Sequence, residues 1–264
     1  MRGRGQREAP GEGWPLAVLL LALWPHWHWM ARRMTDGSDE PWGVVAAVTV
    51  ALLVAREWRT LRVPSDRALL ACACLALAAA MASLVAPPLF AASIAMLALA
   101  TFLNSARPDA PAAPLATLLL LALPVIATLQ FYLGYPLRWL TAHAAAPLLS
   151  VAGFDVRAAG AALQWGAKTI LVDPPCAGIG MLWIGSCAAA LFSHLQRAGA
   201  SRTLANGAAA AAIVFVANVA RNTALFFPEA GLVDWPDGFH PAIGLAAMAG
   251  AIVAIFAVVH RKTR

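Results

Sequence analysis

The stretch ALLACACLALAAAMASLVA, from Ala68 to Ala86, decides the fold. It contains no charged residue, and about 20 apolar residues are enough for an α-helix to cross a bilayer. The composition extends this pattern to the whole chain of 264 residues, of which 61% are hydrophobic and 12% charged. A soluble domain carries about 25% charged residues. We therefore predict an all-α polytopic membrane protein.

Further apolar runs lie on both sides of this stretch, and each is bounded by charge, proline or glycine. The expected spans are Trp14–Met30, Trp42–Ala55, Ala68–Ala86, Leu89–Asn104, Leu115–Leu133, Ile179–Leu195, Leu204–Phe227 and Pro241–Val259. This pattern predicts about eight transmembrane helices in a single integral membrane domain over 1–264. The first five spans lie in 1–133, a structured extracytoplasmic segment in 134–175, and the last three spans in 176–264.

The positions of the basic residues predict the orientation, because cytoplasmic loops retain an excess of Lys and Arg. If both termini are cytoplasmic, 13 of the 19 basic residues fall inside: Arg2, Arg4, Arg7, Arg56, Arg59, Arg62, Arg67, Arg107, Arg197, Arg202, Arg261, Lys262 and Arg264. We expect a plasma (inner) membrane protein with this orientation. The formal charge of +6 does not indicate nucleic acid, since the basic residues lie between apolar runs.

The connection 134–175 is too polar to span and too apolar to be disordered. Within it, Pro136–Ser150 has apolar residues at helical spacing, which predicts a helix at the membrane interface. The run Gly153–Asp173 has β-branched residues near its end and internal glycines, which favours a short hairpin.

The motif DPPCAGI, residues 173–179, opens span six. Asp173 is a plausible N-cap and Pro174 a natural first helical residue, so Cys176 is expected in the first turn. The alternative is that Cys176 merely packs as a small apolar residue. Cys187 and His194 lie farther along the same span, toward the cytoplasm, and are not expected to reach the outer surface.

Two polar positions on spans seven and eight are expected at the same outer surface. Asn218 and Arg221 share a helix face, and an arginine inside an apolar run usually faces a polar cavity or a partner. His240 lies where the chain enters span eight, and an imidazole can carry a proton near neutral pH. The alternatives are that Arg221 reaches to lipid phosphates and that His240 is simply solvated. A cysteine, a proton carrier and a fixed cation together form a set suited to acyl transfer.

In these motifs the chain resembles the exosortase/archaeosortase family of multi-span membrane cysteine transpeptidases. The resemblance covers roughly Leu129–Val259. It rests on Tyr135-Pro136-Leu137-Arg138, Cys176-Ala177-Gly178-Ile179, Asn218-x-x-Arg221, and His240 followed by Gly244. It implies Cys176 as the thiol nucleophile, Arg221 and His240 as further catalytic residues, and an extracytoplasmic active site. Asn218 is expected to be a supporting residue, and Asp173 supports the site as the N-cap.

The resemblance also implies a function. The enzyme would cleave the C-terminal sorting signal of secreted, membrane-tethered proteins (PEP-CTERM substrates: a short motif, a transmembrane helix and a basic tail) and transfer the new C-terminus. The acceptor is left open between lipid, glycan and water. No phosphate loop, HExxH or CxxC pattern appears, so neither a cofactor nor a metal is expected.

Two other functions fit the same residues. In a small transporter or transport-associated protein, Arg221 and His240 would line a path and Cys176 would be incidental. In an assembly subunit without activity, replacing Cys176 would be harmless.

Overall fold

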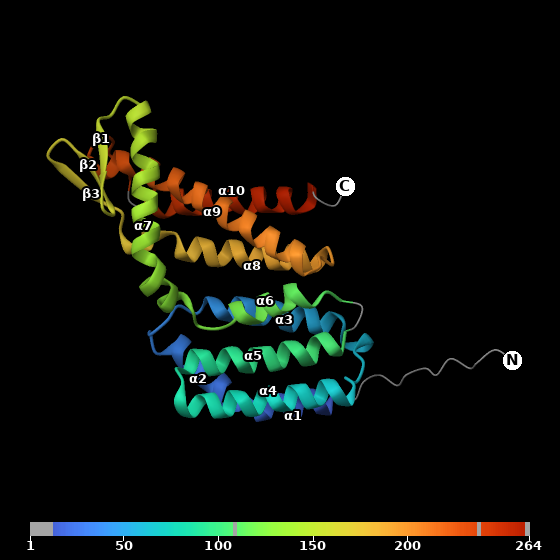
Figure 1. Cartoon of the computed structure of the whole chain (residues 1–264). Coiled ribbons are helices and arrows are strands. Elements are labelled where there is room, and N and C mark those ends of the chain that lie inside the picture. The colour runs from blue at the N-terminus through green and yellow to red at the C-terminus, as the bar shows by residue number, and fades with distance from the viewer. Residues whose placement is uncertain (1–12, 108–109, 237–238, 262–264) are drawn as a thin grey trace. The chain divides into compact units, whose positions relative to one another are not determined.

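The computed structural model describes residues 13–107, 110–236 and 239–261 (Figure 1). The chain divides into two compact units. Unit 1 contains the residues up to Val125 together with His194–Ala200, and unit 2 contains Ile126–Ser193 and the residues from Ser201 onward. The single domain over 1–264 stays a prediction. Five basic residues of the charge count, Arg2, Arg4, Arg7, Lys262 and Arg264, lie outside the described residues.

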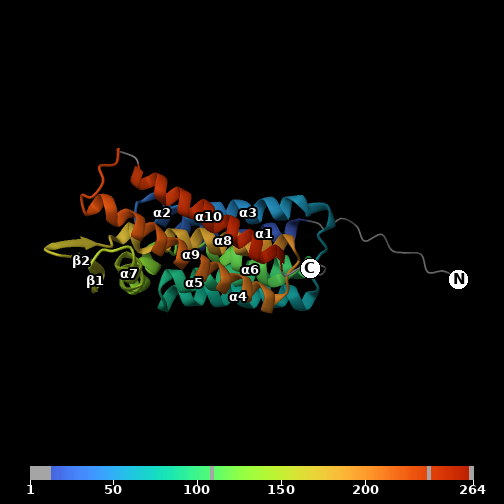
Figure 2. The ribbon, with the colours of Figure 1, turned by 90° about the horizontal axis from the view of Figure 1, so that it is seen from above.

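Unit 1 is helical. Its elements are α1 (Trp14–Ala22), α2 (Trp24–Thr35), α3 (Trp42–Arg56), the 3₁₀ turn η1 (Trp58–Thr60), α4 (Asp66–Val85), α5 (Pro88–Ser105) and α6 (Ala112–Leu121). Helices α4 and α5 lie side by side (Figures 1 and 2). The core of α5 is built largely from alanines, among them Ala91, Ala95 and Ala98, none of which is exposed. Small side chains let helices approach closely, which is how helices associate in lipid.

Unit 2 combines long helices with a small sheet. Its elements are α7 (Ile126–Val151), β1 (Val156–Ala159), β2 (Ala162–Trp165), β3 (Lys168–Leu171), the 3₁₀ turn η2 (Pro174–Ala177), α8 (Ile179–Leu195), α9 (Ala200–Glu229) and α10 (Phe239–Arg261). The last two residues of α8 and the first residue of α9 belong to unit 1. The strands form an antiparallel sheet in the order β1-β2-β3. Phe154 and Trp165 make edge-on contacts with Phe226 of α9, so aromatic packing holds the sheet against the end of that helix.

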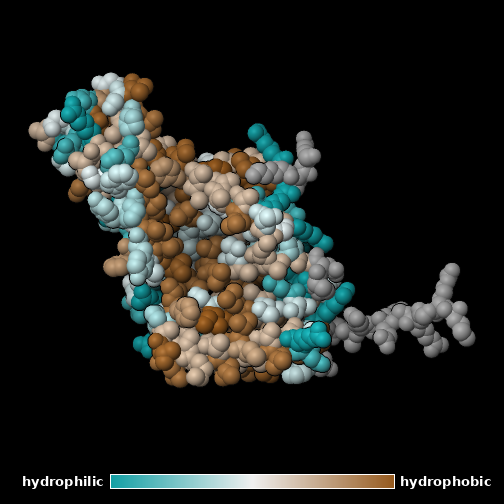
Figure 3. Space-filling model, in the orientation of Figure 1, coloured by the Kyte–Doolittle hydropathy of each residue, from teal (hydrophilic) through white to brown (hydrophobic). Residues whose placement is uncertain are grey.

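Five segments are long and apolar enough to cross a membrane: α4, α5, Pro174–Leu195, α9 and α10. These confirm expected spans three, four, six, seven and eight as helices. Large apolar side chains on α4, α9 and α10 are exposed, including Leu84, Val216 and Leu245. On the face drawn in Figure 3, apolar side chains cover the sides of the helices and hydrophilic ones gather mostly at their ends. The chain is an integral membrane protein.

The other three expected spans are not continuous long helices, so eight spans are not confirmed among residues 13–107, 110–236 and 239–261. The first is divided between α1 and α2, where Pro25 lies in the first turn of α2 and has no N–H for a continuous helix. The second, α3, has only 15 residues. The fifth ends as α6 at Leu121, and after a break that contains Pro124 the chain continues as α7 from Ile126. The pair α6 and α7 can count as one broken span.

The segment predicted between spans five and six is also different in detail. The interfacial helix expected at Pro136–Ser150 is part of the 26-residue α7, which begins at Ile126 and contains Pro136 and Pro147. The expected hairpin is a three-stranded meander, because the turn at Gly166 adds a third strand to the turn at Gly160. Its place outside the membrane stays a prediction.

Candidate functional site

The sequence predicted Cys176 in the first turn of a long helix. In the structure Cys176 lies instead in the short 3₁₀ turn η2. Asp173 occupies the N-cap position of this 3₁₀ turn, but its side chain makes no capping hydrogen bond. The backbone carbonyl of Asp173 instead accepts a hydrogen bond of 2.8 Å from the Cys176 N–H. Gly178, with φ of 82°, separates the turn from α8. Two prolines and a left-handed glycine therefore set Cys176 apart from the regular helix.

Two buried amides from α9 hold the backbone beside Cys176. The Nδ2 atoms of Asn218 and Asn222 donate to the Cys176 carbonyl at 3.1 and 3.3 Å, and Asn222 also donates to the Asn218 carbonyl at 2.8 Å. Asn218 further donates to the hydroxyl of Thr141 on α7 at 3.3 Å. The expected supporting residue Asn218 thus contacts the backbone of Cys176. Asn222 was not predicted for the site, although a second asparagine one helical turn after the first was a signal for it.

Gly178 allows this close contact. A Cβ atom at this position would lie 2.8 Å from Cγ of Asn218, closer than real Cβ atoms approach other atoms. Its positive φ is also one that residues with a side chain rarely adopt. Space and backbone conformation therefore both require glycine between Cys176 and α8.

Arg221 lies one helical turn after Asn218 on α9, next to η2. Its Nη1 donates to the Pro175 carbonyl at 3.5 Å, and a Cβ atom at Gly244 of α10 would lie 3.3 Å from its Nε. The Nε atom is buried and has no hydrogen-bond partner among the described residues. The guanidinium therefore lies between the residue before Cys176 and the backbone of α10, and its Nε donor has no partner among the described residues.

His240, the second residue of α10, lines the same small cavity as Cys176. The cavity has a volume of about 20 Å³, and Asp173, Asn222 and Glu229 also line it.

The structure therefore brings the five residues predicted for the site to one end of unit 2: Cys176, Arg221, His240, Asn218 and Asp173. Nothing in the sequence had indicated Glu229, which ends α9. Among the described residues, no group of three or more His, Cys, Asp or Glu side chains could hold a metal ion.

The family model of the transmembrane exosortases matches residues 29–257, a range that includes every residue of the candidate site. No curated protein and no solved structure matches the chain.

Proposed function

The chain belongs to the transmembrane exosortase family, and we propose that it is a membrane cysteine transpeptidase acting on C-terminal sorting signals. Membership indicates a membrane enzyme that processes such signals. The proposed substrate is a secreted protein held by its own C-terminal transmembrane helix and basic tail. The site would face the extracytoplasmic side of the plasma membrane, because the count of basic residues favours cytoplasmic termini.

The proposed reaction has two acyl transfers. His240 takes the thiol proton as Cys176 Sγ attacks the scissile carbonyl, and Arg221 stabilises the oxyanion that forms. The C–N bond then breaks, His240 protonates the leaving amine, and a thioester to Cys176 remains. An acceptor gives its proton to His240, attacks the thioester and releases the thiol. A lipid or glycan acceptor makes the enzyme a transferase, and water makes it a protease.

The observation that carries this proposal is that Cys176 and His240 line one cavity, with Arg221 bound to the carbonyl just before the cysteine. A thiol that only filled space would not need this surrounding set. The amides of Asn218 and Asn222 would act as positioning groups, since they touch the backbone of Cys176 and not its thiol.

The same geometry implies movement during the reaction. The cavity is about 20 Å³, enough for a single water molecule, so a peptide cannot enter it as it stands. We expect substrate binding to displace the start of α10, where His240 is exposed, from η2.

The test compares two buried cysteines of similar exposure, Cys176 at 7% and Cys187 at 8%. Wild type, Cys176→Ala and Cys187→Ala are each expressed with candidate substrates from the same genome that carry a C-terminal motif, transmembrane helix and basic tail. Mass spectrometry then determines each substrate's C-terminus, and the mass added there identifies the acceptor. Wild type and Cys187→Ala should process the substrate, and Cys176→Ala should not. Equal processing by both cysteine variants would remove Cys176 as nucleophile, and unprocessed substrates with wild type would overturn the sorting function.

A further inference from the structure

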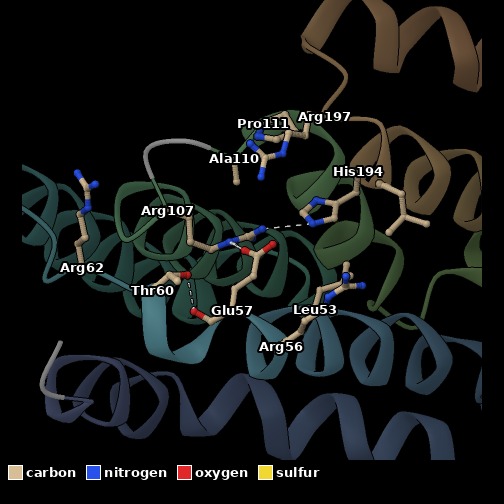
Figure 4. A pocket seen from close by; sticks show the side chains of 11 residues that line it. Leu53, Arg56, Glu57, Thr60, Arg62, Arg107, Ala110, Pro111, His194 and Arg197 are labelled. Carbon is tan, nitrogen blue, oxygen red and sulfur yellow. Dashed lines mark hydrogen bonds and ion pairs between the residues drawn. The ribbon is translucent and has the colours of Figure 1, made fainter. Parts of the chain in front are cut away.

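Unit 1 contains a second polar site, a cavity of about 620 Å³ at the ends of several helices (Figure 4). All its lining residues belong to unit 1. They are Leu53, Arg56, Glu57, Thr60, Arg62, Arg107, Ala110, Pro111, His194, Leu195 and Arg197. The cavity has the volume of a small-molecule pocket, which is usually 300 to 1,000 Å³.

A buried arginine lies at the centre of this cavity. The side chain of Arg107 is 3% exposed, its Nε forms an ion pair of 2.5 Å with Glu57, and its Nη2 lies 3.2 Å from Nε2 of His194. Figure 4 shows these three side chains pointing toward one another. Nη1 of Arg107 and Nδ1 of His194 are also buried, and neither has a hydrogen-bond partner within the described part of the chain. A buried polar group without a partner is costly, so two such atoms on residues that line one cavity point to a ligand that reaches them.

The charge of the lining is strongly positive. Among the described residues that line the cavity, there are four arginines, Arg56, Arg62, Arg107 and Arg197, and one acidic side chain, Glu57, which leaves +3 before His194 is counted. The positive-inside rule accounts for arginines on this predicted cytoplasmic side, but it does not explain why they surround one cavity.

The backbone conformation of Arg197 is unusual. Arg197 is the one described non-glycine residue with positive φ, at 53°, and it lies two residues after the end of α8. Asparagine or glycine adopts this conformation more readily than arginine. Such strained positions gather at functional sites, and here the strained residue contributes a guanidinium to the cavity.

We propose that this cavity binds a phosphate group, with Arg107 and His194 as the buried donors and Arg56 and Arg197 as rim ligands. The planar fork of donors on each guanidinium matches phosphate oxygens, and such charge-assisted bonds are the strong ones. Leu53, Pro111 and Leu195 give the cavity apolar wall as well. The phosphate can therefore belong to an anionic lipid headgroup or come from solution, and the two sources share the chemistry that the residues recognise.

The experiment uses the full-length protein in nanodiscs of phosphatidylcholine alone or of phosphatidylcholine and phosphatidylglycerol in equal parts. Thermal unfolding is followed against inorganic phosphate, with sodium chloride at matched ionic strength as the reference. Native mass spectrometry counts bound phosphatidylglycerol. The test variant is Arg56→Gln with Arg197→Asn, because both side chains are exposed and asparagine suits the backbone at residue 197. The control is Arg59→Gln, an exposed arginine of η1 that does not line the cavity.

A soluble source predicts a saturable rise in Tm with inorganic phosphate in phosphatidylcholine discs. A lipid source predicts a higher Tm and retained lipid in phosphatidylglycerol discs only. In either case the double variant should raise the half-saturating concentration, or lower lipid retention, by about tenfold, and Arg59→Gln should match wild type. No response to either probe would overturn the site. An equal loss in the double variant and Arg59→Gln would assign the effect to general surface charge and overturn it as well.

Discussion

In unit 2, two buried amides hold a backbone carbonyl, whereas in unit 1 a buried guanidinium is held by a carboxylate and an imidazole. Neutral amides fix the backbone without bringing a charge that needs a counter-ion. Buried charges depend on one another, and removing one partner leaves the other uncompensated. The comparison suggests that the cluster around Cys176 serves geometry and rate, and the cluster around Arg107 serves stability and ligand binding.

The first prediction tests whether the cluster around Cys176 controls the rate of the reaction. Arg221→Lys should lower processing by about 10² to 10³-fold, the usual cost of losing one oxyanion donor, because lysine offers a point charge in place of a planar fork. The measurement is the initial rate of appearance of the processed substrate in membranes with equal enzyme content. Arg202→Lys is the control, since Arg202 is also half-buried on α9 but lies near its other end. A near-normal rate in Arg221→Lys would indicate that Arg221 only contacts lipid.

How well the sequence predicts a span depends on how its apolar run ends. Spans six, seven and eight were predicted because apolar runs there end at charges and glycines that also end the helices. Spans one and five are not confirmed as continuous helices, because their apolar runs continue through breaks at Pro25 and Pro124. Hydropathy reports which residues avoid water, and it does not report whether one helix contains them all.

Some residues of the candidate site could be predicted from the sequence, and others could not. Cys176, Arg221 and His240 stood out because each is polar or reactive at the end of an apolar run, and the topology put them on one surface. Glu229 gave no such signal, since its approach to the cavity depends on how α9 ends against the sheet. The cavity around Arg107 was also missed, because its arginines looked like ordinary topology signals. Their convergence depends on contacts between segments far apart in the sequence, such as Glu57, Arg107 and His194.

The second prediction tests whether the cluster around Arg107 stabilises the protein. Glu57→Gln should destabilise the protein by about 2 to 3 kcal/mol, because Arg107 stays buried without its counter-ion. Thermal unfolding in nanodiscs measures the loss, and Glu40→Gln, at an exposed glutamate of the same unit, should change little. If the cavity binds phosphate, added phosphate should raise the Tm of Glu57→Gln more than that of wild type. A variant as stable as wild type would mean that solvent or lipid already satisfies Arg107.

The third prediction concerns the junction between η2 and α8. Gly178→Ala should destabilise the protein by about 2 kcal/mol, because its φ of 82° strains a residue with a side chain and the new Cβ would meet Asn218. Processing should fall as well, since Asn218 would move away from Cys176. Gly180→Ala is the control two residues later, where nothing lies within 4 Å of the added atom, and it should be neutral or slightly stabilising. Unchanged Tm and rate in Gly178→Ala would refute the close approach of Asn218.

The fourth prediction separates the position of Arg221 from the stability of unit 2. Gly244→Ala places a Cβ atom 3.3 Å from Nε of Arg221, so the guanidinium must shift by a few tenths of an ångström while the helix itself gains a better helix former. We expect Tm to stay level or rise and the processing rate to fall about tenfold, or about 1.4 kcal/mol in the barrier, since misplaced catalytic groups lose rate steeply. Gly250→Ala, on the same helix with open space around the added atom, should show the gain in Tm without the loss in rate. A loss of rate in both variants would point to a general effect on α10 in place of a displaced Arg221.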